Sequence, residues 1–444
     1  MPLWSFLLII GLAFTTLFFL RLSAGHPLRS PLHDILDCLV GALLWGATAL
    51  MTQRPAASAL FWAVLAGGLL LADYTKRAVL REPVVFADAS ELIQLAFHPR
   101  FYLPYVHPLL FYGAGGGLLL LTAWLFSIET PMLNPASLMP RLYGAALLVV
   151  PVLLYFTRTG VVFFERCLSL LRSDSVLEHD LAKFGILGTF LVHTVKSRFE
   201  RPTRQALCKF GSIEVPTSMP PIVLVQAESF FDIERFDPAM KHVLPNFSQC
   251  QAASYSYGQL NVAAWGANTI RSEFSALSGI PSDALGLDSF NPYYAFARKK
   301  IDTLVWKLRT AGYQTICVHP YDRSFYGRHK VMPNLGFDYF YGREAFPNEK
   351  GRFVSDEAVA KWVNNFVNHA TMPVFVFVIT IANHGPHGSQ GPSEYEGYIE
   401  GIKATDRMIK ALTSADWITQ KQGILTEYGD HQPGLPELLK SSSS

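Results

Sequence analysis

Residues 373–381 read PVFVFVITI, and the polar sequence ANHGPH follows them at 382–387. The first segment is apolar almost without interruption and is rich in Val, Phe and Ile, which is typical of a strand buried on both faces. A strand with one face in water would alternate apolar and polar residues instead. This segment therefore predicts a strand inside a largely parallel sheet, with helices covering both faces.

Three more apolar runs resemble this one. They are PIVLVQ (221–226), QTICVH (314–319) and QGILTEYG (422–429). Segments with helical periodicity lie between the runs, namely KIDTLVWKLRTAGY (300–313) and DEAVAKWVNNFVNHA (356–370). Buried strands that alternate with helices predict an α/β domain with a mainly parallel central sheet.

Polar residues with ionisable side chains follow each of the four runs. These residues are Glu228, His319, Asp322, Arg328, His384, His387, Asp430 and His431. In open α/β sheets, ligands bind beyond the carboxyl ends of the strands, which meet at one edge. One polar residue after a strand is usually a cap or a solvated loop residue. Agreement among four strand ends predicts a shared polar site at that edge.

The residue types at this edge suit a divalent metal ion. Carboxylate, hydroxyl and imidazole groups together favour an ion such as Mn²⁺ or Zn²⁺. Glu228, Asp430 and His431 are candidate ligands, and Thr269 in the loop-like sequence GANTIRSEF offers a hydroxyl. Contact with a metal would lower the pKa of that hydroxyl and produce a nucleophile near neutral pH. Ser272 is the competing hydroxyl in the same sequence.

Three neighbours of Thr269 have more ordinary interpretations. We expect Arg271 and Glu273 to form a local ion pair on the helix that follows Thr269, without a part in catalysis. Trp265 either walls a pocket or packs in the core, and the sequence leaves both open.

The first 165 residues are overwhelmingly apolar, and five runs in them approach the roughly 20 residues that a helix needs to cross a bilayer. The runs are residues 3–20, 35–51, 59–74, 109–128 and 142–156. They predict a transmembrane domain of five helices over residues 1–165, with five soluble core helices as the alternative. A helical linker over 166–218 and the α/β domain over 219–444 complete the predicted organisation.

Charge gives conflicting information about orientation. Lys and Arg gather in the loops after the first and third runs, namely Arg21, Arg29, Lys76, Arg77, Arg81 and Arg100. The positive-inside rule would make these loops cytoplasmic and place the C-terminal domain inside the cell. The five cysteines show neither a CxxC nor a zinc-site spacing, and a formal net charge of +2 indicates no nucleic-acid partner.

The motifs of the α/β half resemble those of the lipoteichoic acid synthase family of phosphoglycerol transferases. These are membrane-anchored members of the alkaline phosphatase and sulfatase superfamily. The matching motifs are VQAESFFD, GANTIRSEF, HPYDRSFYGR, NHGPH, EGYIEGIKATDRMI and YGDHQPG. The resemblance covers most of the chain, and it implies a sulfatase-like α/β domain behind a five-helix transmembrane domain.

The resemblance also implies roles for individual residues. The implied metal ligands are Glu228, Thr269, Asp430 and His431, with Mn²⁺ as the expected ion and Mg²⁺ or Zn²⁺ as alternatives. Thr269 is the implied nucleophile. The residues implied to bind the glycerophosphate head group are His319, Tyr326 and Arg328, and His384 is expected close to the entering or leaving oxygen.

The chain departs from the family pattern in its third motif and at its end. The family has an Asp two residues after the first His of the third motif, where Tyr321 stands here, and its aromatic residue at the Tyr326 position is typically Trp. Family members also continue well past the Asp-His pair, whereas only QPGLPELLKSSSS follows it here. We therefore expect a domain truncated at its C-terminus.

The implied function is metal-dependent transfer of phosphoglycerol from phosphatidylglycerol, or a similar phospholipid, to a glycan or glycolipid acceptor. The reaction would serve the cell envelope from a bacterial inner membrane, with the catalytic domain in the periplasm or outside the cell. One alternative is transfer of phosphoethanolamine, or hydrolysis of a phosphodiester or sulfate ester. NTIRSEF lacks the C/S-x-P-x-R signature of sulfatases, and the scattered cysteines differ from the disulfide-rich domains of phosphoethanolamine transferases. An inactive truncated membrane protein is the other alternative.

Overall fold

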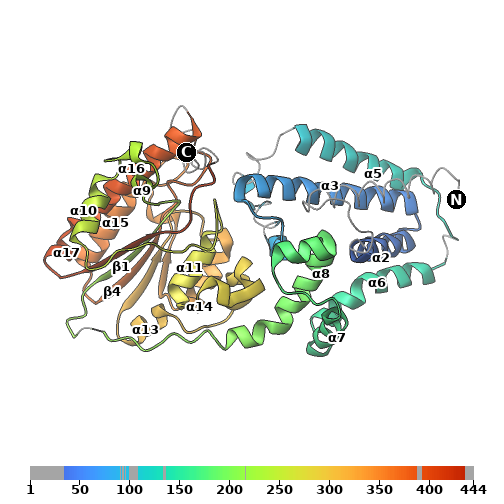
Figure 1. The fold of residues 1–444 in the computed structure, drawn as a ribbon, viewed down its shortest axis with the longest axis horizontal. Helices are drawn as coiled ribbons and strands as arrows, with labels where there is room; N and C mark the ends of the chain where they lie inside the picture. The colour runs from blue at the N-terminus through green and yellow to red at the C-terminus, as the bar shows by residue number, and fades with distance from the viewer. Residues whose placement is uncertain are drawn as a thin grey trace. The chain divides into compact units, whose positions relative to one another are not determined.

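The computed structural model describes residues 35–90, 92, 95, 97–99, 109–133, 137–215, 217–387 and 393–435. The chain divides into two compact units, Met1–Pro202 and Thr203–Ser444. The first unit is helical, and the second is built on a β-sheet (Figure 1).

The described part of the first unit consists of helices that coincide with the predicted apolar runs. They are α2 (Ile35–Thr52), α3 (Pro55–Leu80), α5 (Gly116–Ile128) and α6 (Met139–Tyr155), followed by α7 (Arg158–Ser169) and α8 (Leu177–Gln205). The first predicted run, residues 3–20, lies outside the described residues. Helices α2 and α3 are each long and apolar enough to cross a membrane. Helices α6 and α7, bent by 103°, make a third candidate if they count as one span.

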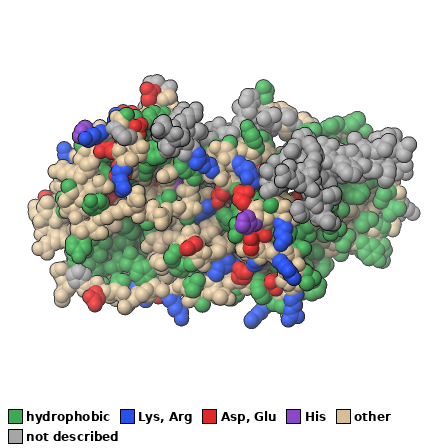
Figure 2. Space-filling view, viewed as in Figure 1, with side chains coloured by type: hydrophobic (Ala, Val, Ile, Leu, Met, Phe, Trp, Pro, Cys, Tyr) green, Lys and Arg blue, Asp and Glu red, His purple; other side chains and the backbone are tan. Residues whose placement is uncertain are grey.

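The described residues therefore support two or three membrane spans and not the predicted five. Helix α5 has 13 residues. At about 1.5 Å per residue it spans roughly 20 Å, which is less than the about 30 Å of a bilayer core. A short π-helix, η5 (Leu109–Gly115), occupies the rest of that run. Apolar side chains such as Leu120, Trp124 and Leu153 are nevertheless exposed, and Figure 2 shows many hydrophobic side chains on this unit. Such a surface suits lipid better than water.

The second unit contains a five-stranded sheet in the order β3-β2-β4-β1-β5. The strands are β1 (Ile222–Ala227), β2 (Gln314–Val318), β3 (Tyr339–Tyr341), β4 (Val374–Ile379) and β5 (Ile424–Gly429). Every pairing is parallel. The four predicted strands and the parallel sheet are confirmed. Strand β3 was not predicted, because three residues are too few to show a periodicity.

Helices cover both faces of this sheet (Figure 1). One face packs against α11 (Thr269–Ser278), α12 (Pro292–Phe296), α13 (Leu304–Thr310) and α14 (Arg328–Leu335). The other packs against α15 (Asp356–His369), α16 (Glu394–Thr413) and α17 (Asp416–Thr419). Strand β4 shows why its sequence is apolar throughout. Phe375 and Phe377 enter the first core, whereas Val374 and Val376 enter the second.

Short helices complete the described elements. They are η2 (Phe86–Ser90), α9 (Ile233–Phe236), η6 (Pro238–Met240), α10 (Pro245–Ala253), η7 (Ser282–Phe290), η8 (Phe325–Gly327) and η9 (Arg343–Ala345).

The sheet register brings the carboxyl ends of four neighbouring strands to one edge. Ala227 of β1 pairs with Gly429 of β5, so that the next residues, Glu228 and Asp430, leave the sheet side by side. Val318 of β2 pairs in the same way with Val378 of β4. The predicted meeting of strand ends is thus a direct result of the register.

Candidate metal centre and active site

Glu228, Asp430 and His431 form a buried cluster at this edge. One ligand atom from each lies within 4.8 Å of the others. His431 Nε2 is 3.5 Å from Glu228 Oε1 and 3.4 Å from Asp430 Oδ2. All three side chains are at most 5% exposed. The structure therefore brings together three of the residues predicted to bind a metal.

The donor atoms of this cluster fit a divalent cation. Asp430 Oδ1 accepts hydrogen bonds from the backbone N–H groups of Ser229 and His431, each at 2.8 Å. The other oxygen, Oδ2, is buried without a hydrogen-bond partner among the described residues. Burial, and next the charge of Asp430, raise the pKa of Glu228 well above its usual value. Two buried carboxylates in this position call for a positive charge between them.

The orientation of the His431 ring points to the same ion. Its Nδ1 lies 3.0 Å from the carbonyl oxygen of Gln432 and must carry the proton of that hydrogen bond, since a carbonyl only accepts. The lone pair of a neutral ring is then on Nε2, which faces the two carboxylates. Metal-binding histidines commonly donate their other N–H to a carbonyl in this way. A cation between Nε2 and the carboxylates would turn three repelling acceptors into ligands.

Thr269 is the first residue of α11, and two hydrogen bonds hold that end of the helix against the Asp430–His431 segment. The N–H of Gly266 donates to the carbonyl oxygen of Gln432 at 2.9 Å. One turn after Thr269, the hydroxyl of Ser272 donates to the carbonyl oxygen of Asp430 at 2.6 Å. These bonds flank Thr269 and place it beside the carboxylate cluster. The first N–H groups of a helix have no partner within the helix, so this end also suits a phosphate.

Glu273 is part of a buried ion pair that sequence reasoning assigned to the wrong partner. The predicted pair with Arg271 is wrong, because residues two apart on a helix point to different sides. Glu273 instead accepts two hydrogen bonds from Arg328, from Nε at 3.2 Å and from Nη2 at 2.8 Å. Both side chains are at most 1% exposed. The hydroxyl of Tyr293 and the amide of Gln226 also donate to Glu273.

Arg328 in turn fixes His319. The Arg328 Nη1 atom donates a hydrogen bond to His319 Nε2 at 3.3 Å. His319 Nδ1 donates to the carbonyl oxygen of Ile379 at 3.1 Å. Burial, and next the adjacent charge of Arg328, hold the pKa of His319 well below its usual value. The ring is therefore neutral, with its proton on Nδ1. The structure thus brings together two of the three predicted head-group residues in one chain from Glu273 to His319.

Tyr326, the third predicted head-group residue, lies against this chain. Its ring centroid is 5.2 Å from the Arg328 guanidinium carbon. Tyr326 has a left-handed backbone with φ of 53°, and so do Ser229 (φ 53°) and Asn268 (φ 68°). Ser229 directly follows Glu228, and Asn268 directly precedes Thr269. Tyr326 is itself a predicted site residue. This conformation is uncommon outside glycine, and such strain concentrates at functional sites. No sequence pattern predicted it.

His384 follows β4 and is half-buried. Its Nδ1 donates to the carbonyl oxygen of Gly385 at 2.9 Å, so Nε2 is its basic nitrogen. Burial lowers the pKa of His384 to about 3, although the hydrogen bond to the Gly385 carbonyl acts in the opposite direction. His384 also contributes to the lowered pKa of His319.

Asp322 and His387 also follow strands, but their contacts give them structural roles. Asp322 is exposed and accepts a hydrogen bond from the N–H of Ser324 at 2.7 Å. His387 is buried with its ring edge against Tyr398, whose hydroxyl donates to the carbonyl of Ser229 at 2.8 Å. Burial lowers the pKa of His387 to about 4. Asp322 therefore caps a turn, and His387 packs behind the loop that carries Glu228.

The chain shows sequence similarity to known proteins mainly in its second unit. The Sulfatase family matches residues 220–442, which is half of the chain. The capsular polysaccharide biosynthesis protein RkpI of Rhizobium meliloti (strain 1021) is 34% identical over 234 residues, or 50% of this chain and 42% of RkpI. The chain spans less than half the length of the curated relatives it matches, between 37% and 44%.

Solved structures align with the chain at low sequence identity. The integral membrane phosphoethanolamine transferase EptA from Neisseria meningitidis aligns with a TM-score of 0.50 and 10% identity, over 95% of this chain and 82% of EptA. The phosphoglycerol transferase GacH from Streptococcus pyogenes aligns with a TM-score of 0.41 and 21% identity, over 56% of this chain and 69% of GacH. The alignment with EptA shows a shared fold that includes an N-terminal helical unit.

The family match begins just before β1 and extends past Asp430 and His431, so that it includes the whole sheet and the buried cluster at its edge. The superfamily that the motifs resemble is thereby confirmed: the chain belongs to the sulfatase family.

Proposed function

We propose that this protein is a membrane-anchored phosphoglycerol transferase. It takes phosphoglycerol from phosphatidylglycerol and transfers it to a hydroxyl of a glycan or lipid-linked acceptor in the cell envelope. The observation that carries the proposal is the buried Glu228, Asp430 and His431 cluster beside the helix end that begins with Thr269. The description of RkpI as a capsular polysaccharide biosynthesis protein supports an acceptor in the envelope.

The reaction proceeds in two displacements. In the first, the Thr269 Oγ–P bond forms and the bond from phosphorus to the diacylglycerol oxygen breaks, which leaves glycerophospho-Thr269. In the second, an acceptor hydroxyl attacks phosphorus and Thr269 is restored. Splitting one displacement into two easier ones is the usual gain of covalent catalysis. A divalent cation, Mn²⁺ in our proposal, would bind to Glu228, Asp430, His431 and Thr269 and supply the charge that lowers the hydroxyl pKa. The N–H groups of the first turn of α11 stabilise charge on the phosphoryl oxygens.

His384 handles the protons of both displacements. Its Nδ1 donates to the carbonyl oxygen of Gly385, which makes Nε2 the acceptor nitrogen of a neutral ring; burial lowers its pKa to about 3, so the ring is neutral and weakly basic at physiological pH. It accepts a proton from the attacking hydroxyl and returns one to the departing oxygen.

Arg328, His319 and Tyr326 bind the phosphoglycerol head group in this proposal. Three of the five N–H groups of Arg328 serve Glu273 and His319, so two remain for phosphate or glycerol oxygens. The second candidate function is phosphoethanolamine transfer, or hydrolysis of a phosphodiester or sulfate ester. We retain it because the phosphoethanolamine transferase EptA shares the fold.

The two hydroxyls of α11 distinguish this proposal from its alternatives. Thr269→Ala should abolish diacylglycerol release from fluorescent phosphatidylglycerol, because the attacking oxygen is gone. Ser272→Ala loses a hydrogen bond to the Asp430 carbonyl, which costs about 0.5–1.5 kcal/mol of stability. It should keep clearly measurable turnover, because the Gly266–Gln432 hydrogen bond still holds this end of α11 and the attacking oxygen is present. Release is measured with the full chain in lipid nanodiscs supplied with Mn²⁺. If Thr269→Ala still turns over while Ser272→Ala is dead, the nucleophile is misassigned.

Glu273 should act as a positioning residue for the head group. Glu273→Gln removes the charge that holds Arg328, and breaking a buried ion pair costs about 3–5 kcal/mol. We expect KM for phosphatidylglycerol to rise at least tenfold, with Mn²⁺ content unchanged. The matched control is Glu344→Gln, which removes an exposed carboxylate 3.8 Å from Arg323 and should change nothing. A change in kcat alone, with KM intact, would contradict this role.

The site-bearing unit faces the periplasm or the cell exterior in this proposal, in a multi-pass protein of the inner membrane, because envelope acceptors are found there. The basic loops predict the opposite orientation, so topology is an independent test. A fusion at residue 220 to a reporter active only outside the cytoplasm should be active. Activity only from a reporter that needs the cytoplasm would exclude the proposed orientation.

A further inference from the structure

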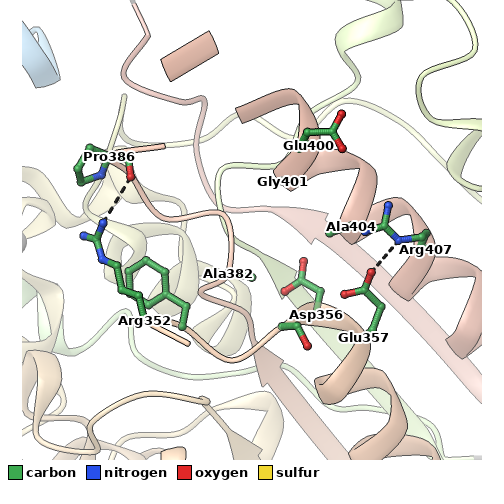
Figure 3. A pocket seen from close by; sticks show the side chains of 11 residues that line it. Arg352, Asp356, Glu357, Ala382, Pro386, Glu400, Gly401, Ala404 and Arg407 are labelled. Carbon is green, nitrogen blue, oxygen red and sulfur yellow. Dashed lines mark hydrogen bonds and ion pairs between the residues drawn. The ribbon is translucent and has the colours of Figure 1, made fainter. Parts of the chain in front are cut away.

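A second cavity lies in the same unit, between the segment before α15, the loop after β4 and helix α16 (Figure 3). Its volume is about 380 Å³, which falls within the roughly 300–1,000 Å³ typical of small-molecule sites. Its walls include Phe353, Asp356, Gly401 and Ala404. None of these residues has a part in the phosphoryl transfer described above.

Asp356 gives this cavity an open hydrogen-bond acceptor. The residue is fully buried, and its Oδ2 accepts a hydrogen bond from the Thr405 hydroxyl at 2.6 Å. Its Oδ1 has no hydrogen-bond partner among the described residues. A buried carboxylate oxygen without a partner is costly, and burial accordingly raises the pKa of Asp356 to about 7. An oxygen of this kind in a cavity wall suits a ligand hydroxyl, which can donate to the carboxylate.

The other acidic residues of the cavity are already engaged. Glu357 pairs with Arg407 at 2.7 Å, and Glu400 pairs with Lys403 at 2.7 Å. The side chains of both of those glutamates are exposed to solvent, whereas Asp356 is buried and its Oδ1 has no hydrogen-bond partner among the described residues. Mg²⁺ and Ca²⁺ take about six or more oxygen ligands, which this arrangement does not provide. A neutral hydroxyl needs only one acceptor, and the ring of Phe353 offers an apolar surface beside it.

The cavity adjoins the loop that carries His384. The rings of Phe353 and His384 lie 6.0 Å apart, with Phe353 also 6.2 Å from Tyr321 of the head-group motif. The Arg352 guanidinium donates to the carbonyl oxygens of Gly385 and Pro386, each at 3.4 Å, and Figure 3 shows the bond to Pro386. A molecule in this cavity would therefore be separated from His384 by a shared aromatic wall.

We propose that this cavity binds a sugar unit of the acceptor glycan through a hydroxyl that donates to Asp356 Oδ1. The proposal rests on the proposed transfer function and assigns its acceptor class: a neutral, hydroxyl-rich glycan whose neighbouring unit reaches His384. Donor binding and acceptor binding then use different residues on the two sides of Phe353.

Binding of glucose disaccharides tests this site without requiring turnover. The full-length protein is placed in lipid nanodiscs, which contain no sugar detergent, and titrated with α-1,4-, β-1,4- and β-1,2-linked glucose disaccharides by saturation-transfer NMR. Ala404→Met fills the cavity from α16, and Asp356→Ala removes the acceptor. Ala411→Met makes the same change at an exposed position of the same helix. Melting temperature and Mn²⁺ content establish that each variant is folded.

We expect at least one disaccharide to bind the wild type and Ala411→Met equally, and both cavity variants to bind it at least tenfold more weakly. No binding to the wild type, or equal binding by Ala404→Met and Ala411→Met, would overturn the proposal. Diacylglycerol release is measured in parallel. If the cavity binds sugar but no diacylglycerol is released, the proposed donor reaction is wrong and the sugar site is supported. If diacylglycerol is released but no sugar binding depends on the cavity, the sugar site is wrong and the donor reaction is supported.

Discussion

The register of the sheet brings two buried carboxyl groups together, and the candidate site of the second unit is built around them. Ala227 of β1 lies opposite Gly429 of β5, so the next side chains, Glu228 and Asp430, emerge side by side in a buried place. His431 adds a third ligand atom within 4.8 Å. Backbone N–H groups neutralise only one oxygen of Asp430 and leave the other without a partner. An arrangement of this kind fits a divalent cation, which would offset the charge of the two carboxylates.

The surrounding structure is organised to hold other groups against that charge. Helix α11 is anchored to the same segment through Gly266 and Ser272, which directs its positive end and Thr269 to the site. Glu273 of α11 pairs with Arg328 at the start of α14, and Arg328 sets the tautomer of His319, which follows β2. Left-handed backbone at Ser229 and Asn268 carries strain next to the ligands. Such strain persists only where neighbouring contacts over-determine the conformation.

The parts of this account that sequence could predict are those with a local signal. Continuous apolar runs identified four strands, and the rule that parallel strand ends share an edge brought Glu228, His319, His384 and Asp430 to one place. The Glu273–Arg328 pair was missed because its partners are 55 residues apart, and a charge on a helix was assigned to its nearest neighbour in sequence. Strand β3 was missed because it is only three residues long.

Two further features were beyond sequence for different reasons. Hydropathy finds apolar runs but not where a helix breaks, so a 13-residue helix and a 103° bend leave two or three of the four predicted spans that fall within the described residues. The Asp356 cavity has no motif, because its walls come from three separate elements and its open oxygen appears only once Thr405 is placed. Both features depend on tertiary packing, which local pattern does not contain.

Metal content of the full-length protein tests the central claim most directly. Bound metal is removed from the purified protein with a chelator, and the protein is then incubated with Mn²⁺ and dialysed. Its metal content is measured by inductively coupled plasma mass spectrometry. The account predicts about one equivalent in the wild type and in Asp322→Ala, an exposed carboxylate at the same edge, and none in Asp430→Ala. A full equivalent retained by Asp430→Ala, or no uptake of Mn²⁺, Mg²⁺ or Zn²⁺ by the wild type, would contradict it.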